Sequence, residues 1–428
     1  MKNILFKISI ILFFFLFLHI PTLKADIVRP STRVVDGAII RSQPSTNSAR
    51  AGILKPGEKL PYLGFVPGWN IVRLNNGASA YISKSWSIVV PESTSGDYTI
   101  HTVDVGTGLA IIVQGVDFTL VYDGGSLDDT GRGSDNRLLA YLKAMNTSLT
   151  KIDHLILSHP QQDHVELLPD LFDEYEVSHV WDAGSRNPIC GYRSFIKKVK
   201  EETGVSYHTA LSNFGKAQVS FPAQTCYGDN LSSETFSVES GSRINDQPVI
   251  LGAGASMTFL YADFSDHNDP HENSIVVRLD LGQKRLLLVG DAGAGKRSDP
   301  QSDPTPNSTE GILLNCCAGE LKADVLVVGN HGSLSASRSA FLDAVGADTF
   351  IISSGPTRYD SVVLPDDEII TELTSRGNVY RTDDDIACRT NAGKIGTDND
   401  NKPGGCSNIR TTISKDGTIK TSYWMGTD

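Results

Sequence analysis

Between residues 30 and 92, short apolar runs alternate with polar positions and with turn signals. The stretch GAIIRSQPSTNSARAGILKPGEKLPYLGFVPGWNIVRLNNGASAYISKSW has such signals at 55–57, 67–68 and 75–77. Alternation with a period of two is typical of strands that bury one face, and closely spaced turns favour hairpins. The pattern therefore predicts a small all-β barrel in this part of the chain.

After a polar loop at 91–96 the pattern changes. Longer apolar runs now alternate with stretches that have helical spacing. We expect strands at 98–103, 109–114, 119–122, 151–158 and 285–289, and helices at 135–145 and 165–175. This mixed order predicts an α+β domain in which two sheets pack together with helices outside.

The first 25 residues have the layout of a secretory signal peptide. Lys2 and Lys7 precede an apolar run from Ile8 to Leu18, and a short tail ends at Ala25. The run is short for a membrane span, although an uncleaved anchor is the alternative. We therefore expect an exported protein, periplasmic or secreted, with no transmembrane segment in the mature chain. The expected divisions are a signal peptide at 1–25, the barrel at 30–92 and a larger domain with a C-terminal extension at 97–428.

The chain is acidic, with 50 acidic against 38 basic residues and a net charge of −12. An acidic surface repels nucleic acid unless basic residues cluster locally. The basic stretch at 193–200 is modest and has the pattern of the solvated face of an amphipathic helix. Composition therefore argues against strong nucleic-acid binding and favours a small-molecule or cell-wall-linked substrate.

Six cysteines lie at positions 190, 226, 316, 317, 388 and 406. Export makes disulfides possible. We expect Cys190 to pair with Cys226, and Cys388 with Cys406, because each pair closes a loop rich in polar and turn residues. The adjacent cysteines at 316 and 317 lie on an apolar helical stretch and are expected in the core. The spacing offers no C-x-x-C motif, so a zinc ribbon is not expected.

The strongest chemical signal is the stretch LILSHPQQDH at 155–164. A predicted buried strand runs into a short loop that carries His159, Asp163 and His164. Imidazole nitrogen and carboxylate oxygen are the ligands of hydrolytic zinc and manganese sites, and one turn after a strand lets all three side chains face one point. The alternative, judged on this stretch alone, is a surface loop with a helix cap.

The stretch GDAGAGKRS at 290–298 has the glycines and the lysine of a phosphate-binding loop. That motif requires Ser or Thr after the lysine to hold magnesium, and Arg297 occupies this place. We therefore expect Asp291, at the end of a predicted strand, to be the functional residue. Gly293, Gly295 and Lys296 are expected to form a flexible turn.

Five further motifs accompany these residues along the chain. They are HTVDVGTGLA at 101–110, LVYDGG at 120–125, HENS at 271–274, LLLVGDA at 286–292 and VLVVGNHGS at 325–333. In this order the motifs resemble the metallo-β-lactamase fold, in the branch of the extracellular domain of ComEC-type competence proteins and related exported hydrolases. The resemblance covers about residues 97–360 and implies an αββα sandwich.

By this resemblance, the ligands of one or two metal ions would be His159, Asp163, His164, Asp291 and His331. Zinc is the implied metal, with manganese as a second candidate. Asp163 would also act in catalysis by orienting or deprotonating the attacking water. The implied reaction is hydrolysis of a phosphodiester or another ester by metal-activated water. The resemblance implies no substrate-binding residue.

Three positions depart from the family pattern. Gln161 stands where the family has a second His or an Asp, Asn330 replaces the first His of HHGS, and Leu109 replaces the acid of the DVGQGDA motif. A neutral amide is a poor zinc ligand, so the part of the site that uses His159 is expected to be weakened. His271 could supply a replacement nitrogen, although a solvent-exposed histidine is the favoured expectation for that turn.

The segment at 30–92 resembles the bacterial SH3 family. The matching positions are Arg41, Pro44, Gly52, Leu54, Gly57, Trp69, Val72, Leu74, Gly77, Tyr81 and Ile82. The family usually has a tryptophan where Tyr81 stands. Such modules often bind cell-wall peptides, so the resemblance implies peptidoglycan contact through this domain. A β-rich spacer without a ligand is the alternative.

Two functions from different classes remain open on the sequence alone. The first is an exported metal-dependent hydrolase. The second is a cell-wall or protein binding module, in which the barrel recognises its partner and the larger domain has lost catalysis. Gln161 separates the two, because it decides whether the metal centre is complete.

Overall fold

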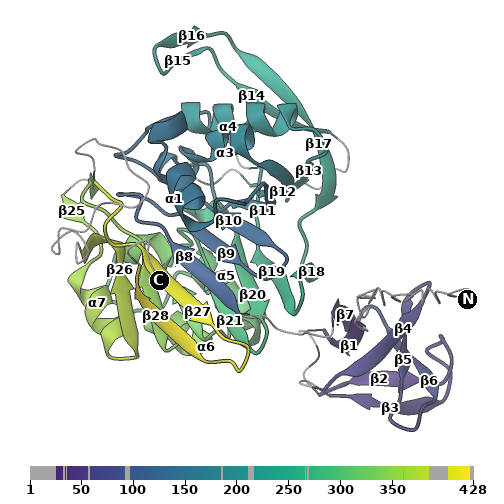
Figure 1. Cartoon of the computed structure of the whole chain (residues 1–428). Helices are drawn as coiled ribbons and strands as arrows, with labels where there is room; N and C mark the ends of the chain where they lie inside the picture. The colour runs from purple at the N-terminus through teal and green to yellow at the C-terminus, as the bar shows by residue number, and fades with distance from the viewer. Residues whose placement is uncertain are drawn as a thin grey trace, which may run out of the picture.

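A computed structural model of the chain shows a small barrel of strands beside a larger layered sandwich (Figure 1). It describes residues 26–31, 34, 36–55, 58–91, 97–184, 187–210, 216–265, 267, 269–359, 361–384 and 403–424. The expected signal peptide at 1–25 lies outside the described residues. Within the described ranges, no helix has both the length and the apolar character that a membrane span requires.

The barrel forms from strands that bury one face. In the described part of the chain its seven-stranded antiparallel sheet has the order β3-β2-β6-β5-β4-β1-β7. The strands are β1 (Asp26–Pro30), β2 (Ala38–Arg41), β3 (Arg50–Leu54), β4 (Leu60–Val66), β5 (Trp69–Arg73), β6 (Ser79–Ser83) and β7 (Ser87–Pro91). In β5, Asn70 and Val72 are buried while Trp69 and Ile71 remain partly exposed, which confirms the predicted alternation. Val28, Val72 and Ile82 lie in the core.

The first sheet of the sandwich joins the two ends of the larger domain. Its order is β14-β17-β13-β12-β11-β10-β9-β8-β27-β28, and β10, β11, β12, β13 and β17 run parallel. The strands are β8 (Tyr98–Thr102), β9 (Ile111–Gln114), β10 (Thr119–Tyr122), β11 (Lys151–Leu157), β12 (Glu176–Asp182), β13 (Ser206–Thr209), β14 (Lys216–Phe221), β17 (Glu234–Arg243), β27 (Ile409–Ile413) and β28 (Ile419–Tyr423). The C-terminal hairpin β27–β28, yellow in Figure 1, pairs with β8 at the start of the domain.

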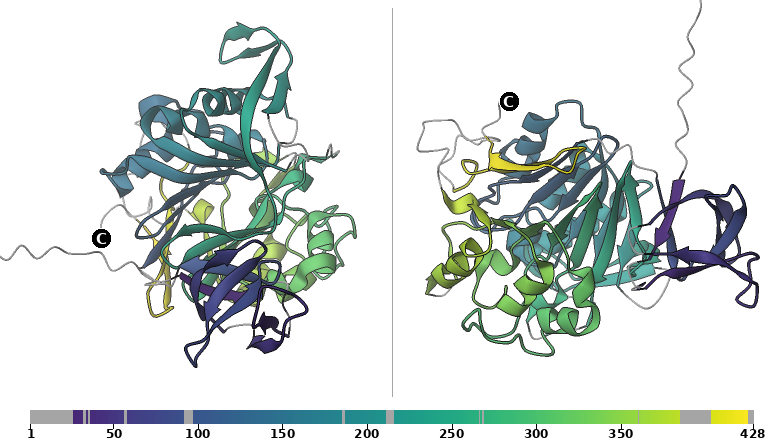
Figure 2. Two further views of the ribbon diagram at one scale, coloured as in Figure 1. Left: turned by 90° about the vertical axis from the view of Figure 1, so that its right-hand side faces the viewer. Right: turned by 90° about the horizontal axis from the view of Figure 1, so that it is seen from below.

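The second sheet has the order β18-β19-β20-β21-β22-β23-β26. Its strands are β18 (Val249–Gly252), β19 (Ala255–Tyr261), β20 (Val276–Leu281), β21 (Lys284–Leu288), β22 (Val325–Val327), β23 (Thr349–Ile352) and β26 (Asn378–Arg381). The last four run parallel. At the other edge, β7 of the barrel contacts β18, which places the barrel beside this edge of the sandwich (Figures 1 and 2).

Helices cover the outer faces of both sheets (Figures 1 and 2). They are α1 (Arg137–Met145), α2 (Gln162–Val165), α3 (Leu171–Glu174), α4 (Cys190–Glu201), α5 (Thr309–Cys317), α6 (Ser339–Val345) and α7 (Asp367–Thr374). Three apolar layers hold the arrangement together. Leu142 of α1 and Phe195 of α4 pack on the first sheet, and Phe341 of α6 and Ile369 of α7 pack on the second.

The middle layer lies between the two sheets. In β10, Leu120 and Tyr122 face this layer while Val121 faces α1 and α4. A strand buried on both faces reads as a continuous apolar run, because neither side meets water. For this reason the strands β10, β11 and β21 could be recognised in the sequence as apolar runs. The predicted αββα sandwich is confirmed.

The expected helix at 165–175 differs from the structure. Its place is taken by α2, by a short 3-10 turn at Leu168–Asp170 and by α3. Pro169 lies in the middle of this segment, and proline cannot donate the backbone hydrogen bond that a continuous helix requires. The break frees α2 to present its side chains at the end of β11.

One of the two disulfide pairings expected from the sequence is present in the structure. Cys190 and Cys226 are bonded, with a Cα–Cα distance of 5.4 Å, which confirms that pairing. Cys388 lies outside the described residues, so its pairing with Cys406 stays a prediction. Cys316 and Cys317 are bonded to each other at the end of α5. The expectation of two core thiols there is wrong, because the end of α5 leaves Cys316 exposed and Cys317 only partly buried.

Candidate metal centre

The candidate ligands follow the ends of neighbouring strands. In the first sheet, β10 is followed by Asp123, and β11 by a short loop that carries His159 and leads into α2 with Asp163 and His164. In the second sheet, β21 is followed within three residues by Asp291, and β22 leads to His331. Because β10 runs parallel to β11, and β21 to β22, the carboxyl ends of each pair lie at the same end of their sheet. The residues that follow these ends in the two sheets come together in one group.

Four of the expected residues form one compact group, Asp163, His164, Asp291 and His331. One ligand atom from each lies within 4.8 Å of those of the others. The Nε2 atoms of His164 and His331 are 3.3 and 3.5 Å from Asp291 Oδ2. His331 Nε2 is also 3.4 Å from Asp163 Oδ2. All four side chains are buried, and the most accessible residue, Asp163, is 6% exposed.

Each imidazole of this group is oriented through its other nitrogen. His164 Nδ1 donates to Asp123 Oδ2 at 2.8 Å, and His331 Nδ1 donates to the carbonyl oxygen of Ser353 at 2.7 Å. Such outer partners fix the tautomer of a metal-binding histidine and leave Nε2 as the ligand atom. Asp123 also accepts from the backbone N–H and the hydroxyl of Ser158, at 2.6 Å each.

The four-residue group fits a cation. His164 Nε2, His331 Nε2 and Asp291 Oδ1 are buried and make no hydrogen bond within the described part of the chain. Buried polar atoms are normally satisfied, so three orphaned ligand atoms at one point indicate a missing partner. That partner must accept electron pairs from nitrogen and from carboxylate oxygen at once, which a divalent metal ion does.

The pKa values of the two histidines in this group also favour a positive charge at this point. Burial acts to lower the pKa of His331, but Asp291 and Asp163 outweigh it and raise that pKa to about 10. Burial likewise acts against protonation of His164, yet Asp291, Asp123 and Asp163 raise its pKa well above the ordinary value. The carboxylates therefore attract positive charge to these two Nε2 positions.

A second group consists of His159, His271 and Asp291. The Nε2 atoms of His271 and His159 lie 3.6 and 4.0 Å from Asp291 Oδ2. The His271 side chain is 28% exposed and its Nδ1 is 2.8 Å from Asp269 Oδ1. This differs from the solvent-exposed position favoured from the sequence, because the short 3-10 turn at Pro270–Asn273 directs the ring toward Asp291.

The side chain of Gln161 contacts a histidine of this second group. Its Oε1 is 2.8 Å from His159 Nε2. Burial and the neighbouring His164 lower the pKa of His159 to about 3, so this imidazole is neutral at pH 7. The structure thus brings the other four expected ligands and His271 together around Asp291, with Gln161 against the Nε2 of His159.

Two loops need unusual backbone to reach the centre. Gly290 has a φ of 52°, and a Cβ there would lie 2.7 Å from the Cβ of Ser158, so only glycine fits before Asp291. Asn330 and His331 have φ values of 48° and 53°. Asn330 turns its amide to Ser335 Oγ at 2.9 Å, and His331 alone of this pair faces the group. The stretch at 290–298 thus contributes Asp291 to the centre.

The sequence analysis missed Tyr359. It lies on the two-residue strand β24 (Arg358–Tyr359), which pairs with β25 (Val362–Val363). Its hydroxyl donates to Asp163 Oδ2 at 2.8 Å, and its ring lies parallel to that of His331 at a centroid distance of 6.2 Å. No motif surrounds Tyr359 in the sequence, so only the fold could identify it. The role of Asp123 in orienting His164 was missed as well, although its DGG motif was visible.

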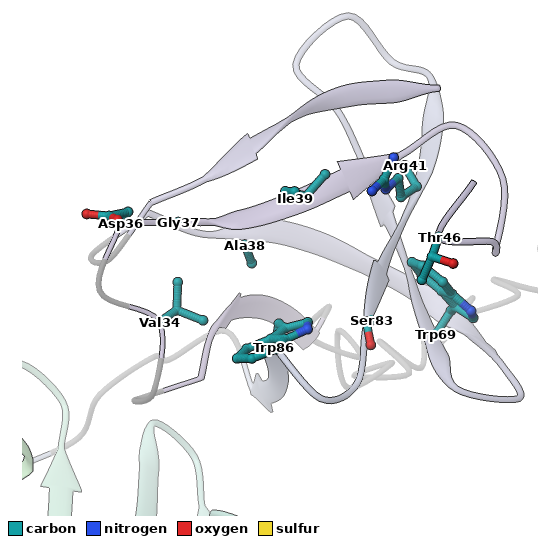
Figure 3. A pocket seen from close by; sticks show the side chains of 10 residues that line it. All are labelled: Val34, Asp36, Gly37, Ala38, Ile39, Arg41, Thr46, Trp69, Ser83 and Trp86. Atoms are coloured by element: carbon teal, nitrogen blue, oxygen red, sulfur yellow. The ribbon is translucent and has the colours of Figure 1, made fainter. Parts of the chain in front are cut away.

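A separate pocket lies on the barrel and has a volume of about 500 Å³ (Figure 3). Two tryptophans line it, and Figure 3 shows Trp86 and Trp69 with Arg41 and Asp36 around the same hollow. Trp86 is 52% exposed. The lining residues are Val34, Asp36, Gly37, Ala38, Ile39, Arg41, Thr46, Trp69, Ser83 and Trp86.

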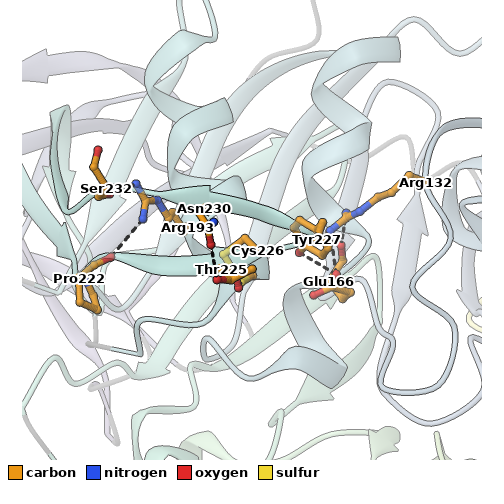
Figure 4. The surroundings of a disulfide bond; sticks show 10 residues. Arg132, Glu166, Arg193, Pro222, Thr225, Cys226, Tyr227, Asn230 and Ser232 are labelled. Carbon is orange, nitrogen blue, oxygen red and sulfur yellow. Dashed lines mark hydrogen bonds and ion pairs between the residues drawn. A yellow bond between two sulfur atoms is a disulfide. The ribbon is translucent and has the colours of Figure 1, made fainter.

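A polar cluster beside the Cys190–Cys226 disulfide holds α2 in place (Figure 4). Glu166, the residue after α2, accepts from Arg132 Nη2 at 2.7 Å and from the Tyr227 hydroxyl at 2.8 Å. Tyr227 lies in the turn between β15 (Gln224–Cys226) and β16 (Asp229–Leu231), which the disulfide ties to the start of α4. Because α2 carries two of the candidate ligands, this cluster positions them.

Comparisons with known proteins identify both parts of the chain. The Metallo-beta-lactamase superfamily matches residues 103–355, and the Bacterial SH3 domain matches residues 36–87. The first match spans more than half of the sequence. The chain therefore belongs to the metallo-beta-lactamase superfamily, and it carries an N-terminal bacterial SH3 domain.

Recombination protein 2 of Haemophilus influenzae is 26% identical to this chain over 258 residues, which are 60% of this chain and 24% of that protein. The chain thus spans about a quarter of the length of this relative, whose likeness supports the ComEC-like branch. Igni18, a metallo hydrolase from Ignicoccus hospitalis, is 12% identical with a TM-score of 0.37, over 67% of this chain and 95% of that one. CmlA, a diiron β-hydroxylase from Streptomyces venezuelae, is 12% identical with a TM-score of 0.36, over 70% and 54%.

Proposed function

We propose that the protein is an exported metal-dependent hydrolase that cleaves phosphodiester or other ester bonds. The observation that carries this proposal is the buried group of Asp163, His164, Asp291 and His331, with three ligand atoms that lack a hydrogen-bond partner. One or two zinc ions fit this set of nitrogen and oxygen donors, with manganese as the other candidate. Export is supported by the Cys190–Cys226 disulfide, since such bonds persist in oxidising compartments.

A divalent ion held by these four residues would supply Lewis acidity and would lower the pKa of a water molecule toward neutrality. Asp163 is then the residue placed to orient and deprotonate that water. Burial acts to raise its pKa, but His164 and His331 hold the pKa of this carboxyl below its usual range. Tyr359 donates to Oδ2 of this carboxyl and so holds its orientation. Asp123 holds His164 through Nδ1, which leaves Nε2 as the atom that would bind the ion.

The net charge narrows the substrate class. With a charge of −12, the chain does not attract a long polyanion. A small phosphodiester, or an ester linked to the cell wall, meets less repulsion than long DNA does. The proposal therefore places a small-molecule or wall-linked ester at the metal centre.

The test begins with metal content. We expect one or two zinc or manganese ions in the full chain after purification without chelator, and hydrolysis of bis(4-nitrophenyl) phosphate. Asp163→Ala removes the catalytic base and should lower kcat by about 10²–10⁴-fold. Asp173→Ala is the matched control, because this exposed carboxylate of α3 forms its ion pair in the described part of the chain with Lys198 at the surface, away from the centre. Absence of both metal and hydrolysis would favour the alternative, a binding module whose sandwich has lost catalysis.

We further propose that the barrel contacts peptidoglycan, and the pocket of Figure 3 supports this role. Its volume of about 500 Å³ is in the range of ligand-binding pockets. Exposed tryptophans give a large contact area at low cost in conformational entropy, and Arg41 and Asp36 offer one charge of each sign to a peptide. Cosedimentation of the full chain with insoluble peptidoglycan tests this, and a chain that stays in solution would make the barrel a spacer.

A further inference from the structure

A pocket beside β14 belongs neither to the metal centre nor to the barrel. Its volume is about 390 Å³, which is in the range of small-molecule sites. It lies where the loop after β12, the first turn of α4 and the strands β13 and β14 meet. Within the described part of the chain, the uncharged residues Gly184, Asn187, Pro188, Tyr192, Tyr207, Gln218, Val219, Ser220, Phe221 and Pro222 line this β14 pocket.

The β14 pocket adjoins the loop that carries the first candidate ligand. The last residue of β12, Asp182, pairs with the last residue of β11, Leu157. The segment that leaves β12 lines the pocket, and the segment that leaves β11 carries His159. Asn187 Nδ2 donates to the carbonyl oxygen of Pro160, the next residue after His159, at 2.7 Å. A residue of the pocket therefore contacts the loop of the metal centre directly.

The walls of the β14 pocket are fixed by the protein itself. The Cys190–Cys226 disulfide ties the start of α4 to β15. Arg193 of α4 donates to the carbonyl oxygen of Pro222 at 3.2 Å, as Figure 4 shows, and to that of Ser232 at 2.6 Å. These links hold the segment around β14 against α4. A preformed pocket loses little conformational entropy when a ligand enters, so weak contacts are enough for binding.

The buried side of the pocket is aromatic. The hydroxyls of Tyr192 and Tyr207 donate to Asp182 Oδ2 at 2.8 and 2.7 Å. Both tyrosines are fully buried, and Phe221 is 3% exposed. Asp182 also accepts from the backbone N–H of Gly184 at 3.0 Å. Because these donors satisfy the carboxylate from within the protein, the pocket offers apolar rings to a ligand and no charge.

The open side of the pocket is polar. Gln218 and Ser220 are exposed and Asn187 is partly exposed. Each side-chain amide offers both hydrogen-bond donors and an acceptor, and the hydroxyl does the same. This mixture matches a group whose own polar atoms both donate and accept.

These properties restrict the ligand. A charged group would be buried without an ionic partner, which is unfavourable, so a phosphate does not belong here. A nucleobase binds by stacking on an exposed aromatic face, and the aromatic rings of this pocket are buried. A sugar ring has an apolar C–H surface for the rings of the buried side, and hydroxyl or acetamido groups for the amides of the open side.

We propose that the β14 pocket binds an uncharged sugar ring of the substrate and thereby places a linked ester at the metal centre. This inference rests on the proposed function and deepens it, because it names the part of the substrate that does not react. Binding of a remote group holds the reacting bond in position and raises the catalytic efficiency toward esters that carry it. The substrate would then be a sugar ester of the cell wall.

The first test is binding of N,N′-diacetylchitobiose to the full chain, measured by saturation-transfer NMR and by calorimetry. Val219→Trp fills the pocket and should abolish binding, because Val219 is a partly buried lining residue. Gln218→Ala should weaken binding by about tenfold, or about 1.4 kcal/mol. Gln283→Ala is the matched control, since this exposed glutamine lies in the turn between β20 and β21. The thermal unfolding midpoint of each variant reports its fold, and Gln218→Ala carries the test if Val219→Trp does not fold.

The second test compares three phosphodiesters that share a 4-nitrophenolate leaving group and carry methyl, N-acetylglucosamine or thymidine as the other group. We expect kcat/KM for the sugar diester to exceed that for the methyl diester by about tenfold or more, mainly through a lower KM. This ratio should fall toward one in Val219→Trp. A thymidine diester that is cleaved as efficiently as the sugar diester would overturn the assignment to a sugar.

Together the tests separate this inference from the proposed function. Hydrolysis without a preference for the sugar diester, and without binding of the disaccharide, overturns the inference and leaves the hydrolase proposal standing. Disaccharide binding that Val219→Trp abolishes, without hydrolysis of any diester, supports the sugar site and overturns the hydrolase proposal. Binding that survives in Val219→Trp and is lost in Trp86→Ala assigns the sugar to the barrel and overturns the inference.

Discussion

The barrel pocket and the candidate metal centre differ in which side chains they expose to solvent. In the pocket, apolar surface faces solvent, and Trp86 is 52% exposed. In the metal centre, carboxylates and imidazoles are buried, and His164 and Asp291 are at most 1% exposed. Exposed aromatic surface can bind a partner as it stands, whereas a buried cluster of unpaired ligand atoms is complete only with an ion. We therefore expect the two proposed roles, wall binding by the barrel and hydrolysis at the candidate metal centre, to be separable by mutation.

Asp291→Asn is expected to have the largest effect on the candidate metal centre. The carboxylate is common to both ligand groups, so its loss should weaken metal binding by more than the roughly 100-fold that an outer-shell change can cost. We expect little metal by mass spectrometry and no ester hydrolysis. Peptidoglycan cosedimentation through the barrel should not change. A variant that lost wall binding together with metal would show that the two regions are coupled.

Asp123→Asn is expected to have the next largest effect. Asp123 touches no ion position itself but holds His164 Nδ1 and the Ser158 backbone. The amide cannot accept from all of these donors, so metal affinity should fall by about 10–100-fold while the protein stays folded. Calorimetric metal titration measures this. Asp117→Asn is the control, because Asp117 lies in the turn between β9 and β10 and, within the described residues, accepts its hydrogen bonds from the Ala253 backbone. Equal metal affinities in the two variants would show that Asp123 does not position His164 for metal binding.

The sequence predicted the parts of the site that are local. His159, Asp163 and His164 lie within a few residues of the end of one buried strand, and Asp291 lies just after another, so short sequence patterns were enough. Tyr359 is 196 residues from Asp163 and lies on a strand of two residues with no apolar pattern. Its position depends on how the β24–β25 hairpin folds over the centre, which no local pattern reports.

The fold, like the site, could be predicted from the sequence only where the pattern is local. The runs that became β10, β11 and β21 were predicted because both faces of each strand are buried. The hairpin β27–β28 alternates correctly, but its pairing with β8 joins residues about 300 positions apart, and only the finished sheet selects that partner. The helix expected at 165–175 failed for a local reason, since Pro169 interrupts it.

Trp86→Ala tests the barrel side of the comparison. A tryptophan at the centre of a binding pocket contributes about 2 kcal/mol or more, so affinity for peptidoglycan should fall by about 30-fold. Hydrolysis of bis(4-nitrophenyl) phosphate should keep its kcat and KM. Phe65→Ala is the control, because Phe65 is 64% exposed on the barrel and does not line the pocket. If the two variants bind alike, the hollow of Figure 3 is not the recognition surface.

The smallest effect on function is expected at Glu310, which supports the loop after His331 from outside the centre. Glu310 is buried at the start of α5 and accepts from the backbone N–H groups of Ser337 and Arg338. Burial raises its pKa to about 8, although the two backbone donors oppose this. A carboxyl whose pKa is higher in the folded than in the unfolded state binds its proton more tightly in the folded state. Its contribution to stability is therefore complete below the unfolded pKa and is lost as the pH rises through 8.

Denaturant unfolding at a series of pH values measures this contribution as a difference between two proteins. We expect the free energy of unfolding of the natural chain to fall between about pH 5 and pH 9 relative to that of Glu310→Gln. The amide copies the shape of the protonated carboxyl and does not titrate. Barrel binding should be the same in both proteins at every pH, because Glu310 lies in the sandwich. Parallel stability curves for the two proteins would mean that Glu310 stays ionised in the fold, with its two backbone donors outweighing its burial.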